Sequence, residues 1–173
     1  MECEGFFGCF ESVVGSTATQ NSLLFFAAAV AVVSVLYARA TAKKQQSADL
    51  LLQSRTDGEL VAAMRCISDL HELGDGSIRD LASKTAAETK EAKCVRYVLN
   101  HWEYVSVGVQ SGIYDEAMLR RASFNTVIQL HKSVRPFIDN LRGITGRNTI
   151  YQEFQWLAER WEAKGLSRKK PKS

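Results

Sequence analysis

Hydrophobic side chains are distributed in two different ways along this chain. Residues 23–38 carry no charge, and Ser34 interrupts an otherwise apolar run. Beyond residue 56, apolar residues recur instead at spacings of three and four, as at Leu60, Met64 and Ile67. A continuous apolar run suits a helix surrounded by lipid, whereas a period near 3.6 indicates a helix with one buried face. The pattern therefore predicts an all-α protein, with one N-terminal transmembrane helix followed by a small helical bundle.

The length and the flanks of the apolar run support a membrane span. A spanning helix needs about 20 residues, with a lower limit near ~17. Asn21 and Ser22 extend the run at one end, and basic residues that can reach the lipid headgroups follow it at the other. We predict a span over residues 21–42. The predicted membrane-span residues are Leu23, Phe25, Phe26, Ala28, Ala31, Ser34 and Tyr37, and the interfacial anchors are Arg39, Lys43 and Lys44.

Two other interpretations of the apolar run remain open. A cleaved signal peptide fits the small-residue sequence "ARA" at 38–40. A signal peptide begins with a basic region, however, and the residues that precede the apolar run in this chain are acidic. A buried core helix is the second alternative. For a membrane span, the orientation follows from the basic residues, because none precedes the run and three follow it. The sequence thus predicts a plasma (inner) membrane protein with its N-terminus outside and its main domain in the cytoplasm.

Beyond the span, the sequence predicts a helical stalk at 43–55, a cytoplasmic domain of four or five helices at 56–165, and a basic tail at 166–173. Residues 1–20 form an extracytoplasmic segment in this scheme. Capping residues mark the helix ends: Asp57 or Thr56, then Ser77, then Asp115 as N-caps, and Gly165 as the last C-cap. A long helix is expected over 84–110. Pro136 is expected to break the next helix and open a new turn.

Four sequence blocks resemble a known family. They are "LNHWEYVSVGVQSGIYDE" from Leu99, then "RPFI", "LR" and "YQEFQWLAERW", within a region from Leu50 to Trp161. In order and spacing they resemble the bacterial and prophage proteins grouped as domain of unknown function 4760. The resemblance implies one N-terminal membrane span and a small helical cytoplasmic domain. It implies no activity and no site residues.

One pair of residues offers a catalytic hypothesis. Arg96 and His101 form an R-x4-H pattern that resembles the motif of HEPN ribonucleases, which are all-helical and cleave RNA with paired Arg and His side chains. On a helix, five residues turn through roughly 500°, which leaves the two side chains about 140° apart. The alternative, which we prefer, is that the region packs in a core. The predicted core residues are Val98, Trp102, Val105, Phe137, Phe154, Trp156 and Trp161.

Other polar residues have structural explanations. Asp115 and Glu116 resemble paired carboxylates, but an N-cap followed by a first-turn glutamate explains them. Arg135 and Arg142 can receive either an anion or the carboxylate of Glu153, and we prefer a structural ion pair with Glu153. Four cysteines, Cys3, Cys9, Cys66 and Cys94, include no C-x-x-C pair, and the three histidines lack ligand spacing with them. We therefore expect no metal site, no cofactor and no catalytic residue.

Partner expectations come from charge and from small residues. The net charge of +3 is too small to favour nucleic acid. Arg168, Lys169, Lys170 and Lys172 lie beyond the last expected helix, where they can contact anionic lipid. Alanines in the span permit close helix approach, and a leucine-rich stalk follows, so we also expect a homo-oligomer.

Three function classes remain open. The preferred prediction is a non-enzymatic, single-pass membrane adaptor or scaffold that self-associates and binds an unidentified protein. The first alternative is an oligomeric pore or depolarising effector in phage defence, because the chain is similar in outline to small membrane accessory proteins of CRISPR systems. The second alternative is a HEPN-like ribonuclease that uses Arg96 and His101.

Overall fold

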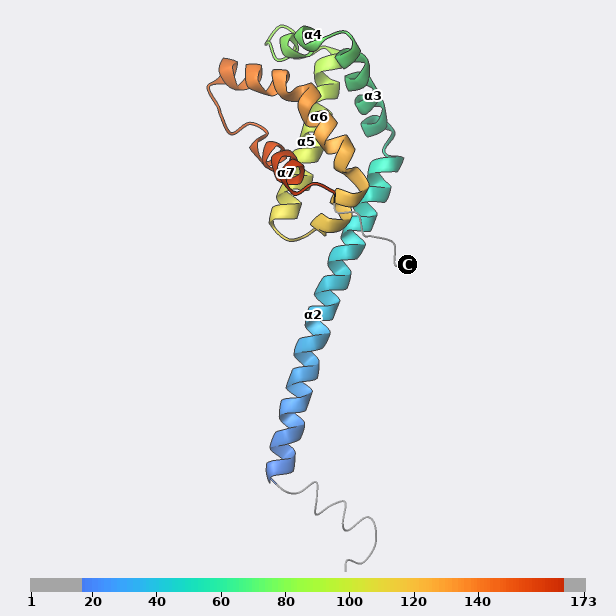
Figure 1. The fold of residues 1–173 in the computed structure, drawn as a ribbon, viewed down its shortest axis with the longest axis vertical. Coiled ribbons are helices and arrows are strands. Elements are labelled where there is room, and N and C mark those ends of the chain that lie inside the picture. Colours follow the sequence, from blue (N-terminus) through green and yellow to red (C-terminus); the bar gives the residue numbers. More distant parts are fainter. Residues whose placement is uncertain (1–16, 167–173) are drawn as a thin grey trace, which may run out of the picture. The chain divides into compact units, whose positions relative to one another are not determined.

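The protein is described by a computed structural model, which defines residues 17–166; of these, the side chains are placed from residue 20, except at 75 and 76. Every regular element in this range is a helix (Figure 1). The helices are α2 (Thr17–Thr56), α3 (Gly58–Glu72), α4 (Asp75–Asp80), α5 (Lys90–Gln110), α6 (Glu116–Thr145) and α7 (Gln152–Lys164). No strand occurs between residues 17 and 166. The predicted all-α class, with a long apolar helix ahead of a bundle, is confirmed.

Helix α2 belongs to two compact units of the chain, which divide between Ala42 and Lys43. In the first unit, the most apolar stretch of α2 has none of its residues buried. Phe25 is 79% exposed and Leu36 is 59% exposed. The helix is long and apolar enough to cross a membrane, a property that a signal sequence near the N-terminus would share.

The second unit is a bundle in which α5 packs against α3 and α7, while α6 packs against α4 and α7 (Figure 1). Each of these four longer helices, α3, α5, α6 and α7, buries one stripe of apolar side chains in a common core. The largest fully buried side chains include Trp161, Phe137 and Phe154. Val98, Trp102 and Val105 of α5 are also buried. Trp156 differs from the other core candidates, because it is only half-buried and packs at the edge of the core.

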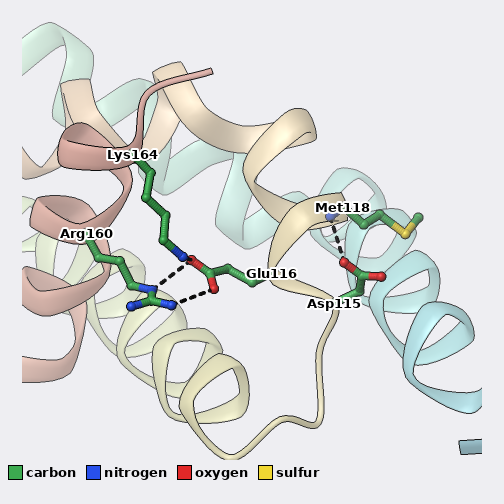
Figure 2. Close-up of polar contacts among 5 residues, drawn as sticks. All are labelled: Asp115, Glu116, Met118, Arg160 and Lys164. Atoms are coloured by element: carbon green, nitrogen blue, oxygen red, sulfur yellow. Dashed lines mark hydrogen bonds and ion pairs between the residues drawn. The ribbon is translucent and has the colours of Figure 1, made fainter. Parts of the chain in front are cut away.

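Local capping explains where several helices begin and end. The carboxylate of Asp57 accepts a hydrogen bond from the amide of Leu60, and Asp115 accepts one from Met118, both at 3.0 Å (Figure 2 shows the second). Gly165 follows α7 with φ of 60°, a conformation that glycine adopts without strain. These three predicted caps are confirmed.

Two predicted boundaries are wrong. Ser77 lies inside the short helix α4 and does not cap it; its hydroxyl donates to the carbonyls of Leu70 and Gly74. The helix expected at 84–110 begins only at Lys90, because Thr89 caps it by accepting from the amide of Ala92. A serine or threonine hydroxyl can either accept from a helix or donate to a preceding carbonyl, and sequence alone does not separate the two.

The predicted break at Pro136 is also wrong, because α6 continues through it from Glu116 to Thr145. A proline inside a helix removes one backbone hydrogen bond and costs about 3 kcal/mol. Val134, Phe137 and Ile138, on either side of the proline, are all buried on the core-facing stripe. Burying one large apolar side chain gains roughly 1.5–3 kcal/mol. Burial of this stripe therefore outweighs the cost of the proline.

Candidate functional site

A groove of about 500 Å³ opens on the bundle and is lined by the end of α2 and by α3, α5 and α6. Leu50 and Leu51 come from α2, Leu60 and Met64 from α3, and Trp102 from α5. Its lining is completed by Ser54, Arg55, Val61, Arg65, Ser68, His101, Val105, Leu119, Ala122, Ser123 and Thr126. Its volume lies in the range of small-molecule pockets, roughly 300–1,000 Å³.

The groove has an apolar wall and a cationic rim. Leucine, valine, methionine and tryptophan side chains make most of the wall, and no aspartate or glutamate lines it. Arg55 and Arg65 are the two permanently charged lining residues, and both are exposed. Neither guanidinium forms an ion pair or a side-chain hydrogen bond within residues 20–166. The site therefore combines apolar contact with unpaired positive charge.

His101, one of the two candidate catalytic residues, lines this groove. Its Nε2 lies 3.4 Å from the hydroxyl of Ser54, and its ring packs edge-on to Trp102 with centroids 5.5 Å apart. Burial lowers the pKa of His101 below its usual value, against the opposing influence of the Asp57 carboxylate. Because the Ser54 hydroxyl donates to the carbonyl of Leu50, a neutral imidazole with its proton on Nε2 can donate one hydrogen bond to Ser54.

Arg96, the other candidate, does not join His101. Arg96 lies near Tyr151 at the start of α7, where its charge lowers the pKa of the phenol against the dominant effect of burial. Its Nε is buried and has no hydrogen-bond partner in the described chain. His101, by contrast, contacts Ser54 of α2. Within one chain the two side chains therefore face different neighbours, and the R-x4-H spacing builds no shared site.

Glu103, next to the predicted core residue Trp102, caps another helix. Its carboxylate accepts hydrogen bonds from the amides of Phe154 at 2.8 Å and Glu153 at 3.4 Å, which are free amides in the first turn of α7. Burial raises the pKa of Glu103, and these two hydrogen bonds act against that rise. The residue that precedes α7, Tyr151, has φ of 56° and supplies no side-chain cap. Sequence reasoning missed this contact because it joins positions fifty residues apart.

A second missed contact ties α2 to the start of α6. Ser47 is fully buried, and its hydroxyl donates to the carbonyl of Lys43 at 2.9 Å. The same oxygen accepts a hydrogen bond from the amide of Asp115 at 2.6 Å. The only available signal was a serine within an otherwise polar and leucine-rich stretch. That signal does not identify a partner 68 positions away.

The charged residues make other pairs than expected. Glu116 accepts from both Arg160 and Lys164 of α7, so the pair Asp115–Glu116 combines a cap with an ion-pair cluster (Figure 2). The predicted pairing of Glu153 with Arg135 and Arg142 is wrong.

Each of these three residues has another partner. Arg142 donates to the carbonyl of Ile150 and to Gln155, and Arg135 lies 3.7 Å from Asp139, while Glu153 accepts from Gln110. Arg142 therefore binds the connection between α6 and α7, and does not bind the carboxylate of Glu153.

The predicted membrane-span residues and their interfacial anchors lie on α2. The candidate membrane-span residues from Leu23 to Tyr37 are all exposed, and Ser34 donates to the carbonyl of Val30. Arg39 and Lys44 are exposed and Lys43 is half-buried. The candidate lipid-contact residues 168–172 and the cysteines at 3 and 9 lie outside the described residues.

The remaining cysteines, Cys66 and Cys94, are free and half-buried. Burial and a hydrogen bond with the neighbouring Cys94 raise the pKa of Cys66 to about 12. Such a thiol stays protonated at neutral pH and is a poor nucleophile. No cluster of histidine, cysteine and carboxylate side chains suited to a metal occurs in the described part of the chain.

The fold and the groove together define a class: an all-helical domain that follows a long apolar helix and carries one apolar groove with a cationic rim. The family model described as a domain of unknown function (DUF4760) matches residues 22–161. This match covers most of the chain, so the protein belongs to that family. The predicted resemblance is confirmed, and the match extends it from the helical domain into the apolar helix. No curated protein and no solved structure matches the chain.

Proposed function

We propose that this protein is a non-enzymatic adaptor, held in the plasma membrane by the apolar part of α2, whose helical domain binds a partner in the cytoplasm. The observation that carries the proposal is that every residue in the apolar part of α2 is exposed within the described chain. Removing apolar surface from water is worth roughly 25 cal/mol per Å². A helix that is apolar all round and is not buried by the described residues of its chain finds that stabilisation in lipid.

Membrane association and processing can be tested together. The full chain, expressed in a bacterium, should stay in the membrane pellet after extraction with alkaline carbonate and should keep its intact mass. Release into the soluble fraction would contradict a membrane span. A product shortened near Ala40 would show that the helix is a cleaved signal peptide instead.

Orientation can be tested with a membrane-impermeant maleimide on intact cells. Cys3 and Cys9 should react from outside, because the basic residues that follow the span favour an external N-terminus. A cysteine placed at exposed Ser111, in the turn after α5, should react only after the cells are permeabilised. Labelling of the Ser111→Cys variant in intact cells would reverse the proposed orientation.

Self-association is part of the proposal. Three consecutive alanines from Ala27 and a further alanine at 31 allow two such helices to approach closely, which is what drives helix contact in lipid. The mass of the full chain in nanodiscs should therefore correspond to more than one copy. A clean monomer at micromolar concentration would remove self-association and, with it, the pore alternative.

The absence of catalysis can be tested at His101. Its position beside Ser54 and away from Arg96 supports a packing role. The His101→Phe variant should fold, and both the variant and the wild type should cleave single-stranded RNA only at the background rate. Cleavage of RNA by the wild type that the variant loses would favour the ribonuclease alternative.

A further inference from the structure

The groove between α2, α3 and α6 has a composition that fits a specific kind of ligand. It offers an apolar wall, two arginines at the rim and no carboxylate. A purely apolar ligand would leave the arginines unused, and a hydrophilic anion would leave the wall in contact with water. A ligand with an apolar body and one negative end would satisfy both parts.

The groove volume limits the shape of that ligand. If each methylene group takes up about the volume of one water molecule in the liquid, ~30 Å³, then 500 Å³ holds a chain of roughly 16 carbons. A three-turn helix, about 10 Å wide and 16 Å long, occupies more than ~1,000 Å³. One alkyl chain therefore fits within the groove, whereas a partner helix or both chains of a phospholipid would extend out of it.

The rim is placed to receive a carboxylate. Arg55 stands at the end of α2 and Arg65 on α3, so guanidinium groups from two different helices border the same opening. An arginine can bind a carboxylate through two parallel hydrogen bonds. Hydroxyls of Ser68 and Ser123 also line the groove and can donate to the same group, whereas the Ser54 hydroxyl already donates to the carbonyl of Leu50.

We propose that this groove binds a long-chain fatty acid, with the alkyl chain along Leu60, Met64 and Trp102 and the carboxylate between Arg55 and Arg65. All lining residues lie between positions 50 and 126, so the site is formed by the helical domain and does not depend on where the apolar part of α2 resides. Fatty acid binding would give the adaptor a small-molecule input that the proposed function does not include.

Photo-crosslinking tests the site in the full chain. The protein is reconstituted in nanodiscs of phosphatidylcholine, because a detergent could itself occupy the groove, and is exposed to a palmitate analogue that carries a diazirine in its chain. Mass spectrometry should place the crosslinks on peptides of α3, α5 and the first half of α6. Crosslinks confined to the apolar part of α2 would overturn the proposal.

Blocking variants separate the groove from the rest of the surface. Ala122→Trp on α6 and Val61→Trp on α3 fill the groove from two different helices and should each abolish groove labelling. Ala117→Trp, an exposed position on α6 outside the groove, is the matched control and should label as the wild type does. Two blocking variants guard against a fold defect in one of them. Undiminished labelling in both folded variants would contradict the site.

Charge variants test the headgroup. Arg55→Gln and Arg65→Gln should each reduce labelling about two- to five-fold, the range expected for an exposed ion pair, whereas Arg121→Gln on α6 should not. Palmitate should compete with the probe, and hexadecanol should compete much more weakly.

Three further outcomes would contradict this assignment. Equal competition by the alcohol would overturn the carboxylate site, and groove labelling by a phosphatidylglycerol probe but not by the palmitate probe would overturn the fatty acid. Groove peptides crosslinked to a copurifying protein instead of the probe would assign the groove to a protein partner.

Discussion

Phe25 and Phe154 are the same side chain in two opposite environments. Phe25, in the apolar part of α2, is 79% exposed, whereas Phe154, in the first turn of α7, is fully buried. Helix α7 concentrates its apolar residues on one face and covers that face with α5 and α6. The apolar part of α2 has such residues all round, and the described residues of the chain bury none of them. One region thus completes its own core, and the other leaves its apolar surface exposed within the described residues.

The largest effect is expected from charged substitutions in the apolar part of α2. Replacing both Val30 and Val33 by arginine places two charges near the middle of the proposed span, each at a cost of about 2.5–3.5 kcal/mol. The double variant should move from the carbonate-resistant membrane pellet to the soluble or aggregated fraction. Tyr104→Arg with Val107→Arg, at two exposed positions of α5, should leave the protein in the pellet. Equal behaviour of the two double variants would show that α2 has no special need for lipid.

The next prediction compares the two regions by truncating one aromatic side chain in each. Trp161 is fully buried, so Trp161→Ala should lower the free energy of unfolding of the domain by about 3–5 kcal/mol. Phe26→Ala, at a 70% exposed position in the apolar helix, should leave it unchanged. Tryptophan fluorescence during urea titration measures this, because all three tryptophans lie in the helical domain.

A milder substitution sharpens that result. The indole Nε1 of Trp161 is buried without a hydrogen-bond partner within residues 20–166. Trp161→Phe keeps most of the apolar surface and removes the unsatisfied N–H, so it should cost less than half of what Trp161→Ala costs. If Trp161→Phe proved as damaging as Trp161→Ala, an unrecognised partner of the indole would be indicated.

Sequence reasoning predicted the parts of this fold that are encoded locally. The continuous apolar run, the 3.6-residue stripes and the caps at Asp57, Asp115 and Gly165 each depend on neighbouring residues, and the structure has all of them. Pro136 misled the prediction because a rule about local hydrogen bonds competes with burial of Phe137 and Ile138, and the outcome depends on tertiary contacts.

The groove could not be predicted in the same way. Its walls come from α2, α3, α5 and α6, and its residues are spread over more than seventy positions. Each lining residue has an ordinary local explanation: Leu60 belongs to an amphipathic stripe, and Arg65 looks like a solvated surface residue. Only the packing of the four helices shows that Arg55 and Arg65 border the same opening.

A third prediction compares a local cap with a distant one. Asp115→Ala removes the cap of α6 and should cost about 1 kcal/mol. Glu103→Ala removes the carboxylate that serves α7 and should cost about 0.5–2 kcal/mol. Glu103→Gln should be close to neutral, because the amide oxygen can still accept from Phe154 and no charge is then desolvated.

These cap variants are measured by the same urea titration. Hydrogen exchange then shows where each loss is felt. Faster exchange in the first turn of α7 is expected for Glu103→Ala only, and the same change in Asp115→Ala would contradict the assignment of the two caps.

The smallest effect concerns pH and compares a histidine in the core with one in the groove. Burial lowers the pKa of both His131 and His101 below the ordinary value of 6.5. The nearby charge of Arg135 lowers that of His131 further. Below pH 6.5, the unfolded chain therefore binds protons that the folded chain does not yet bind. The free energy of unfolding should fall as the pH drops from 7.5 to 5.5, and it should level off once the folded histidines also titrate.

Substitution separates the two histidines. His131→Leu should reduce the loss of stability between pH 7.5 and 5.5, and His131→Leu combined with His101→Leu should reduce it further. The contribution of Glu103 to the pH dependence of stability has the opposite sign. Burial raises the pKa of Glu103 above the ordinary 4.5, so the folded chain keeps this proton to higher pH. Its contribution is thus full below pH 4.5 and declines as the pH rises through the folded pKa. A wild-type stability that rises on acidification from 7.5 to 5.5 would show that Glu103, and not the buried histidines, dominates this range.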